Sequence, residues 1–279
     1  MTTGTAVEPL TAAGGVHRDT AAALAYPQTN LQLFGLMHRA GYSETDLAVV
    51  SRAYDLAVRL FTAKYRGSGK PLLAHLVGTA GVLASLRAPA PIVAAGVLHA
   101  AYIFGDFGDA AGGATAEKRE TIRREVGAGV EDIIARYDAL RWDESSIEEI
   151  QASIAGLSPD DRGVLLLRLA NELEDHLDLG VLYCGNAEDR RAAIRSWLRG
   201  CVDLAQHLGQ PALAASFERV FGEILSGEVP TVLRQPHDYT HTVAPLSSTF
   251  RPRVALRLFA ERHPRLGRLV GRWTRGRRG

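Results

Sequence analysis

Two histidines, His75 and His99, are the residues whose type and spacing most clearly allow chemistry in this chain. They stand 24 residues apart on adjacent predicted helices. Imidazole nitrogens bind divalent transition metals and exchange protons near neutral pH. Both histidines are therefore candidate catalytic residues, and they would be metal ligands only if a metal is retained. The residue after the second histidine is Ala100, whose methyl group offers no ligand atom.

Other polar side chains lie close to these histidines in the predicted elements. A turn with two cations precedes the helix of His75, a loop with an aspartate follows the helix of His99, and a later helix carries an amide and two carboxylates. These candidates for ligand binding or catalysis are Arg66, Lys70, Asp106, Asn171, Glu172 and Asp175. Asp175 lies four residues after Asn171, so both should face the same side of their helix. For Glu172, a plain ion pair with Arg168 or His176 is the competing interpretation.

The apolar spacing of three and four residues predicts helices along most of the chain. Ser43 and Ser158 are expected N-caps, and Pro159 is expected at a first helical position. The expected helices cover 30–40, 43–64, 71–87, 89–104, 115–138, 144–156, 158–179, 187–208 and 211–226. Strand-like alternation is confined to brief stretches after Pro230. The sequence therefore predicts an all-α fold, a helical bundle.

The composition changes at both ends of the chain. Residues 1–28 are rich in Thr, Ala and Gly without a sustained period, so we expect a flexible N-terminus, followed by one helical domain over 29–228. Residues 229–279 are expected to form a loop and a basic extension. The first residues have neither the basic nor the apolar region of a signal peptide, and the chain has two cysteines, so a cytoplasmic protein with reduced thiols is expected.

The segment from Arg66 to His75, with the pattern RxSGxPxxxH, and the later pair Leu98-His99 resemble the HD superfamily. The resemblance is nearest to the bacterial guanosine-tetraphosphate (alarmone) hydrolases. The stretch LRLANEL at 167–173 resembles the helix that supplies the last metal ligand of that family. The likeness covers about residues 45–180, and it implies a helical bundle with a central pocket lined by these segments.

The resemblance also implies where a metal site would lie. The four ligand positions of the family fall on His75, His99, Ala100 and Asn171, so both carboxylates of the pattern are replaced. A divalent ion held by two imidazoles and two carboxylates is nearly charge-balanced. Each lost attraction is worth about 4 kcal/mol at close range and an effective dielectric of about 20. Two imidazoles and an amide hold a metal such as zinc poorly.

Three functional hypotheses remain open at this stage, and whether the chain is an enzyme stays undecided. The first is a pseudoenzyme-like HD protein with a degenerate metal site, which binds or transforms a small anionic or nucleotide-like metabolite. In that hypothesis His75 and His99 line the pocket, Arg66 and Lys70 attract the anion, and no cofactor is required. The second is an active hydrolase or oxygenase whose divalent transition metal uses relocated carboxylates, for example those of Asp106 or Asp175. There a histidine or Glu172 would act as general base.

The third hypothesis is a regulatory module that depends on the C-terminal tail. Residues 251–279 contain ten arginines and one acidic residue, while the rest of the chain has 22 basic and 30 acidic side chains. Apolar residues interleave with these arginines, which is typical of segments that lie on an anionic membrane or contact nucleic acid. A tail that is solvated or docked on the acidic body is the competing interpretation.

Overall fold

The computed structural model of the chain describes residues 24–109 and 112–243. Within these ranges the fold is all-α, as the sequence predicted. The helices are α1 (Asn30–Arg39), α2 (Glu44–Phe61), α3 (Leu72–Ser85), α4 (Ala90–Leu98), α5 (Ala101–Phe104), α6 (Ala116–Val126), α7 (Ala128–Ala139), α8 (Glu144–Ser153), α9 (Pro159–Leu177), α10 (Ala187–His207) and α11 (Pro211–Ser226). Short 3-10 turns are η1 (Ile154–Gly156), η2 (Gly180–Tyr183) and η3 (Thr231–Leu233). The strands β1 (Lys64–Tyr65) and β2 (His241–Thr242) form one antiparallel pair.

Two helix starts follow the predicted capping signals. The Ser43 hydroxyl accepts the backbone N–H of Asp46 at 3.2 Å, and the Asp46 carboxylate accepts the backbone N–H of Ser43 at 3.0 Å. This reciprocal pair satisfies two of the N–H groups that a helix start leaves free. At α9, the Ser158 hydroxyl accepts the backbone N–H of Asp161 at 3.1 Å, and Pro159 is the first helical residue. Both predicted caps are confirmed.

The predicted helix over 115–138 is wrong at one point, because the chain breaks there into α6 and α7. The break is at Gly127, whose φ of 96° is readily adopted only by glycine. The helix that was expected to carry His99 also ends early. Helix α4 stops at Leu98, His99 is its C-cap, and the short α5 starts after Ala100.

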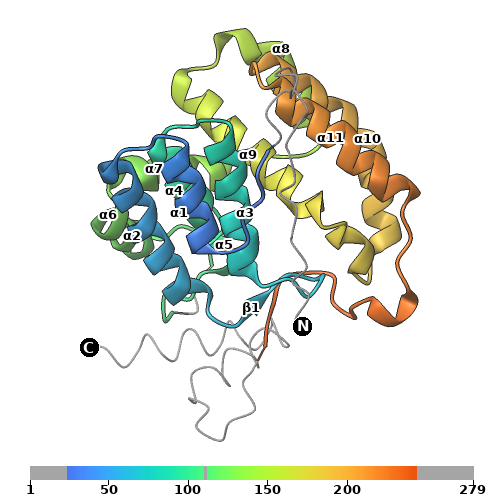
Figure 1. Cartoon of the computed structure of the whole chain (residues 1–279), viewed down its shortest axis with the longest axis horizontal. Coiled ribbons are helices and arrows are strands. Elements are labelled where there is room, and N and C mark those ends of the chain that lie inside the picture. The colour runs from blue at the N-terminus through green and yellow to red at the C-terminus, as the bar shows by residue number, and fades with distance from the viewer. Residues whose placement is uncertain (1–23, 110–111, 244–279) are drawn as a thin grey trace, which may run out of the picture.

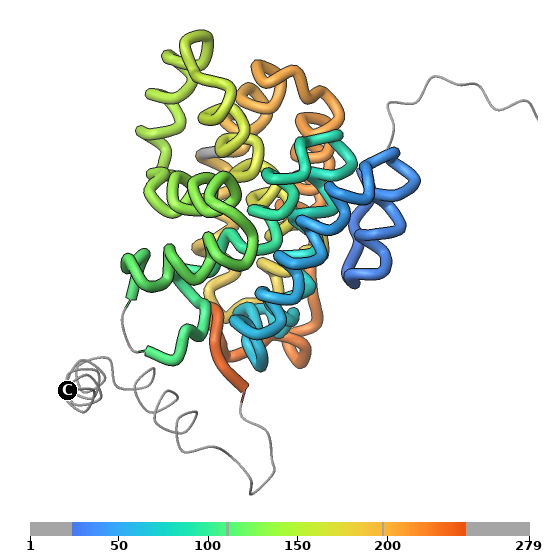
Figure 2. Tube along the Cα trace, turned by 90° about the vertical axis from the view of Figure 1, so that its left-hand side faces the viewer, coloured from blue at the N-terminus to red at the C-terminus, as the bar shows by residue number. Residues whose placement is uncertain are grey.

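Helix α9 lies at the centre of the molecule and joins two groups of helices. It contacts α3, α4 and α7 on one side, and α10 and α11 on the other. Figure 1 shows α1 to α7 on one side of α9 and the α10–α11 pair on the other, and Figure 2 shows the same bundle from the side. Helices α3 and α4 are buried almost all round, so polar residues on them are exceptions. Those exceptions include His75 and Thr79 on α3, and His99 at the end of α4.

The chain after α11 returns to the start of the domain. It runs along the lower edge of Figure 1 to β1, where β2 pairs Lys64 with Thr242 and Tyr65 with His241. On the way, the backbone N–H of Gln235 donates to the carbonyl of Tyr183 at 2.7 Å. The predicted extension over 229–279 therefore begins with a segment that contacts the helical domain. The arginine-rich tail over 251–279 and most of the predicted flexible N-terminus lie outside the described residues.

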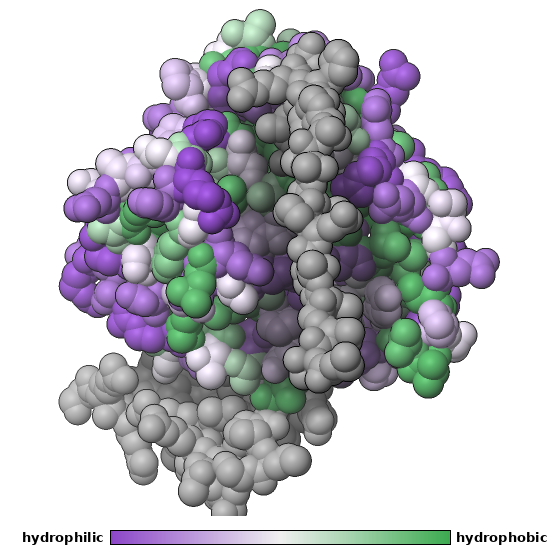
Figure 3. Space-filling model, viewed as in Figure 1, coloured by the Kyte–Doolittle hydropathy of each residue, from purple (hydrophilic) through white to green (hydrophobic). Residues whose placement is uncertain are grey.

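The surface has no broad apolar face in the view of Figure 3, where hydrophilic and hydrophobic residues intermingle on the side that is shown. Among the helices of the described part of the chain, none combines the length and the apolar character that a membrane span requires.

Candidate functional site

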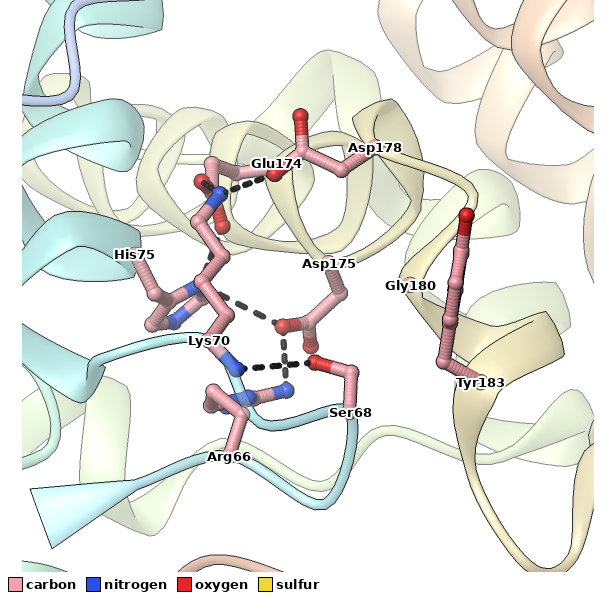
Figure 4. A pocket seen from close by; sticks show the side chains of 9 residues that line it. All are labelled: Arg66, Ser68, Lys70, His75, Glu174, Asp175, Asp178, Gly180 and Tyr183. Carbon is pink, nitrogen blue, oxygen red and sulfur yellow. Dashed lines mark hydrogen bonds and ion pairs between the residues drawn. The ribbon is translucent and has the colours of Figure 1, made fainter. Parts of the chain in front are cut away.

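The candidate site forms where the turn before α3 meets the C-terminal half of α9. The backbone N–H of Arg66 donates to the carbonyl of Lys70 at 2.8 Å, and the N–H of Gly69 donates to the carbonyl of Arg66 at 2.9 Å. Gly69 has a φ of 85°, which a residue with a side chain rarely adopts. This tight turn points both cations of the RxSGK segment toward α9, as Figure 4 shows.

His75 lies in the first turns of α3, with its side chain only 1% exposed. Its Nδ1 contacts the carboxylate of Glu174, and it lies 3.3 Å from Oδ1 of Asp175. Gly78, three residues later on α3, makes room for this arrangement, because a Cβ at that position would collide with the side chain of Glu174. The close approach of α3 and α9 thus places two carboxylates against one buried imidazole.

His99 faces His75 from the end of α4. The two Nε2 atoms lie 3.4 Å apart, and the rings meet edge to face. The Nδ1 of His99 donates to the carbonyl of Gly96 at 2.8 Å, which fixes the hydrogen of the neutral ring on Nδ1. Burial, followed by the electrostatic interaction with His75, lowers the pKa of His99 to about 3. His99 is therefore neutral at pH 7, with the Nε2 lone pair directed toward His75.

The two cations of the turn are paired with carboxylates of α9. Lys70 pairs with Glu174 and, at 2.7 Å, with Asp178, while Arg66 pairs with Asp175. Burial alone would lower the pKa of Lys70, but the neighbouring carboxylates raise it. Burial alone would raise the pKa of Asp175, but the positive charges around it, that of Arg66 first, hold it below its usual range. Two cations thus face three carboxylates, and attraction of an anionic ligand by Arg66 and Lys70 stays a prediction from the sequence.

Two adjacent pockets open at this place. The first has a volume of about 340 Å³ and is called here the histidine pocket. It is lined by Arg66, Ser68, Lys70, His75, Glu174, Asp175, Asp178, Gly180 and Tyr183. The second has a volume of about 320 Å³ and is called here the Arg190 pocket. It is lined by Arg66, Gly67, Ser68, Phe104, Asp175, Gly180, Val181, Cys184, Arg190, Asp238, Tyr239 and Thr240. The ion pair of Arg66 and Asp175 belongs to both linings, so it stands between the pockets.

Four of the residues singled out in the sequence lie away from both linings, among them His99, which was predicted to line the pocket but is buried next to His75. Glu172 is buried and pairs with Arg168 at 2.8 Å, which is the ion pair considered as its alternative role. Asn171 is also buried, and its Oδ1 has no hydrogen-bond partner among the described residues. Asp106 is exposed, and its carboxylate accepts the backbone N–H of Gly108 at 3.0 Å. The structure therefore does not bring Asp106 or Glu172 to the pocket.

Glu174 is the pocket residue in contact with His75 that the sequence analysis did not include. It lies three residues after Asn171, and residues three or four apart share a helix face. The same spacing rule that selected Asp175 would have selected Glu174. The missing information was which side of α9 faces α3.

The residues at the four family positions do not fit the metal that the family pattern implies. Ala100 offers a methyl group, and Asn171 offers a neutral amide, so the two histidines have no carboxylate beside them at these positions. The carboxylates that do approach His75 come from the next turn of α9, and both are already ion-paired with Lys70 and Arg66. A divalent cation there would compete with two fixed positive charges.

A known protein family matches the part of the chain that contains the histidine pair. Residues 53–176 match the HD domain family. That range contains the turn of Arg66, both histidines and the polar half of α9. The match over residues 53–176 thus supports the predicted resemblance to HD-superfamily proteins and to the alarmone hydrolases.

Two curated relatives are similar to part of the chain. A probable GTP pyrophosphokinase of Mycobacterium leprae (strain TN) is 24% identical over 189 residues, which cover 68% of this chain and 23% of that protein. A guanosine-3′,5′-bis(diphosphate) 3′-pyrophosphohydrolase of Haemophilus influenzae is 28% identical over 152 residues, which cover 52% of this chain and 20% of that protein. The chain thus spans about a fifth of the length of these relatives.

Proposed function

We propose that this chain is a divergent HD-domain protein that has lost the usual metal-dependent phosphohydrolase site and binds or transforms a small nucleotide-like metabolite. The observation that carries the proposal is the set of ion pairs around His75. The carboxylates that reach the histidine are paired with Arg66 and Lys70, and the family positions hold Ala100 and Asn171. A pocket of about 340 Å³ is nevertheless retained, within the size range of small-ligand sites.

The ligand class is inferred from the relatives and from the lining together. Both relatives are named for guanosine phosphates, and the histidine pocket offers carboxylate acceptors, a hydroxyl on Ser68 and a phenol on Tyr183. A purine base and a ribose present donors and acceptors that suit such a lining. Guanosine and guanosine 5′-monophosphate (GMP) are therefore the first probes to use.

The test combines metal content with ligand binding. Protein purified without chelator or affinity tag, and its His75→Ala/His99→Ala variant, are analysed for bound metals. We expect no stoichiometric metal in either protein, and a thermal unfolding temperature of the wild type that rises with GMP. A ligand at 100 times its Kd stabilises the folded state by about 2.7 kcal/mol. Stoichiometric zinc, manganese or iron that is lost in the variant would refute the proposal.

A second candidate function, a metalloenzyme with relocated carboxylates, is favoured by one specific observation. Ligand atoms of His75, Glu174 and Asp175 lie within 4.8 Å of one another, the one such group of three among the described residues. A metal there would be bound by one imidazole and two carboxylates after the ion pairs with Arg66 and Lys70 had opened. Metal that is present in the wild type and absent from Glu174→Gln and Asp175→Asn variants would establish this candidate in place of the first.

A role for the arginine-rich tail at a membrane or a nucleic acid stays a prediction from the sequence, and so does the cytoplasmic location.

A further inference from the structure

The Arg190 pocket lies beside the histidine pocket and differs from it in charge. Its lining includes two arginines and two aspartates, and one pair of these, Arg66 with Asp175, is already an ion pair. The remaining charged groups are Arg190 on α10 and Asp238 on the segment that follows η3. This lining therefore has a cation, Arg190, that does not take part in the ion pair of Arg66 and Asp175.

Arg190 is held in place by neutral groups. Its Nε donates to the side-chain oxygen of Asn186 at 2.9 Å, and its Nη2 donates to the backbone carbonyl of Asp238 at 2.8 Å. Within the described ranges, no carboxylate is ion-paired with Arg190, whereas Arg66 and Lys70 each have a carboxylate partner. A guanidinium that is fixed in position and not ion-paired with a carboxylate is suited to bind a phosphate.

Another part of the lining comes from the returning C-terminal segment, which supplies Asp238, Tyr239 and Thr240. Gly67 lies against it so closely that a Cβ would be 2.8 Å from the backbone carbonyl carbon of Asp238. Thr240 of this segment and Ser68 of the turn add hydroxyl groups to the lining. The segment lies outside residues 53–176, the range that matches the HD domain family.

We propose that the Arg190 pocket is the phosphate subsite of a two-part ligand, whose base and sugar lie in the histidine pocket. The inference rests on the proposed function and adds to it the ligand class, a nucleoside monophosphate, and the residue that binds its phosphate. Arg190 binds the phosphate, Ser68 and Thr240 donate from their hydroxyls, and the pair of Arg66 and Asp175 lies beneath the middle of the ligand.

A substitution at Asp238 tests the proposal with an effect on GMP binding that is opposite in sign to that of Arg190→Gln. Its carboxylate lines the same pocket and has no ion-pair partner in the described part of the chain, so it repels a bound phosphate. Removing that charge should strengthen the binding of GMP. A variant that had merely damaged the fold would weaken binding instead.

The experiment is isothermal titration calorimetry on the full chain. GMP, guanosine and inorganic phosphate are titrated into the wild type, Arg190→Gln, Asp238→Asn and the control Arg199→Gln. Arg199 lies on the same helix with its side chain 91% exposed. We expect Arg190→Gln to weaken GMP by about tenfold or more, the loss of a charge-assisted hydrogen bond, and to leave guanosine unchanged. Asp238→Asn should bind GMP more tightly, and Arg199→Gln should match the wild type.

The outcomes separate this inference from the proposed function. If the wild type binds GMP and Arg190→Gln binds it equally well, the phosphate subsite is refuted while the nucleotide pocket stands. Inorganic phosphate that binds as tightly as GMP would refute the two-part ligand, because the base and sugar would then contribute nothing. If neither GMP nor guanosine binds to the wild type, the proposed function fails and the subsite fails with it.

Discussion

At the scale of single residues, Glu174 is the carboxylate that holds the histidine pocket together. It is almost fully buried, it contacts Nδ1 of His75, and it pairs with Lys70. A buried carboxylate stabilises the fold only while its donors stay in place. If a donor or the carboxylate is removed, the group that remains is buried without a partner.

The substitution Glu174→Gln should therefore lower the free energy of unfolding by about 3 kcal/mol, since it leaves the half-buried ammonium of Lys70 with Asp178 alone. Denaturation by urea measures this loss. Glu223→Gln is the matched control, because Glu223 pairs with Arg219 on an exposed helix face, where such a pair contributes about 0.5 kcal/mol or less. Equal losses in the two variants would contradict the role assigned to Glu174.

His99 makes the stability of the protein depend on pH. Its pKa is about 3 in the folded chain and 6.5 as the ordinary value, so the unfolded chain binds more protons between these two pH values. The free energy of unfolding should therefore decrease as the pH falls from 6.5 toward 3, by at most about 1.4 kcal/mol per pH unit from this residue.

Denaturation at a series of pH values measures that slope. The variant His99→Gln should have a smaller slope in the same window, while the exposed His207→Gln should match the wild type. The lowered pKa of Asp175 acts in the same direction at the acid end, so some slope remains in the variant. An unchanged slope in His99→Gln would show that His99 is not buried in its neutral form.

The sequence motifs gave the positions of His75, Arg66 and Lys70 in the pocket, but not those of Glu174 and Asp178. Successive residues of an α-helix are rotated by about 100°, so Glu174 and Asp175 lie within about 60° of Asn171, and Glu172 lies about 100° away. Glu174 and Glu172 thus lie about equally far, roughly 80°, on opposite sides of the centre of the face that Asn171 and Asp175 define. Which of the two glutamates faces the pocket depends on how α9 packs on α3, and a local sequence pattern does not contain that information.

At the scale of elements, apolar spacing and capping residues predicted the order of the helices. They did not predict where a helix breaks. Gly127 ends α6 and precedes α7, but a glycine within a helical pattern can also be tolerated without a break. The pairing of β1 with β2 joins segments that are 178 residues apart, as in the pair of Lys64 and Thr242. No local pattern contains such a contact.

We expect Gly67 to be the glycine whose lack of a side chain lets the C-terminal segment pack against the turn before α3. In Gly67→Ala the new methyl group would press on the backbone of Asp238, so we expect a loss of about 1–3 kcal/mol in the free energy of unfolding. Amide hydrogen exchange should become faster over residues 235–243. Gly129→Ala on α7 serves as control, because a Cβ there has open space. Unchanged exchange in Gly67→Ala would contradict the close packing of the segment.

At the scale of the whole molecule, the region that matches the HD domain family is joined to a C-terminal segment that adds a second pocket. The domain over 53–176 supplies both histidines, the RxSGK turn and the carboxylates of α9. Helix α10 and the segment over 235–242 supply Arg190, Asp238 and the strand that pairs with β1. Most of the pocket could be predicted from the motifs of the domain, whereas the Arg190 pocket required the path of the chain beyond it.

The central claim is that this pocket binds a nucleotide-like ligand without a metal. The most direct measurement is calorimetric titration of GMP into the full chain, shown by elemental analysis to be free of metal, in buffer with and without a chelator. We expect saturable binding of one GMP per chain that is the same in both buffers. Binding that appears only after zinc or manganese is added would contradict the claim, and so would the absence of binding in either buffer.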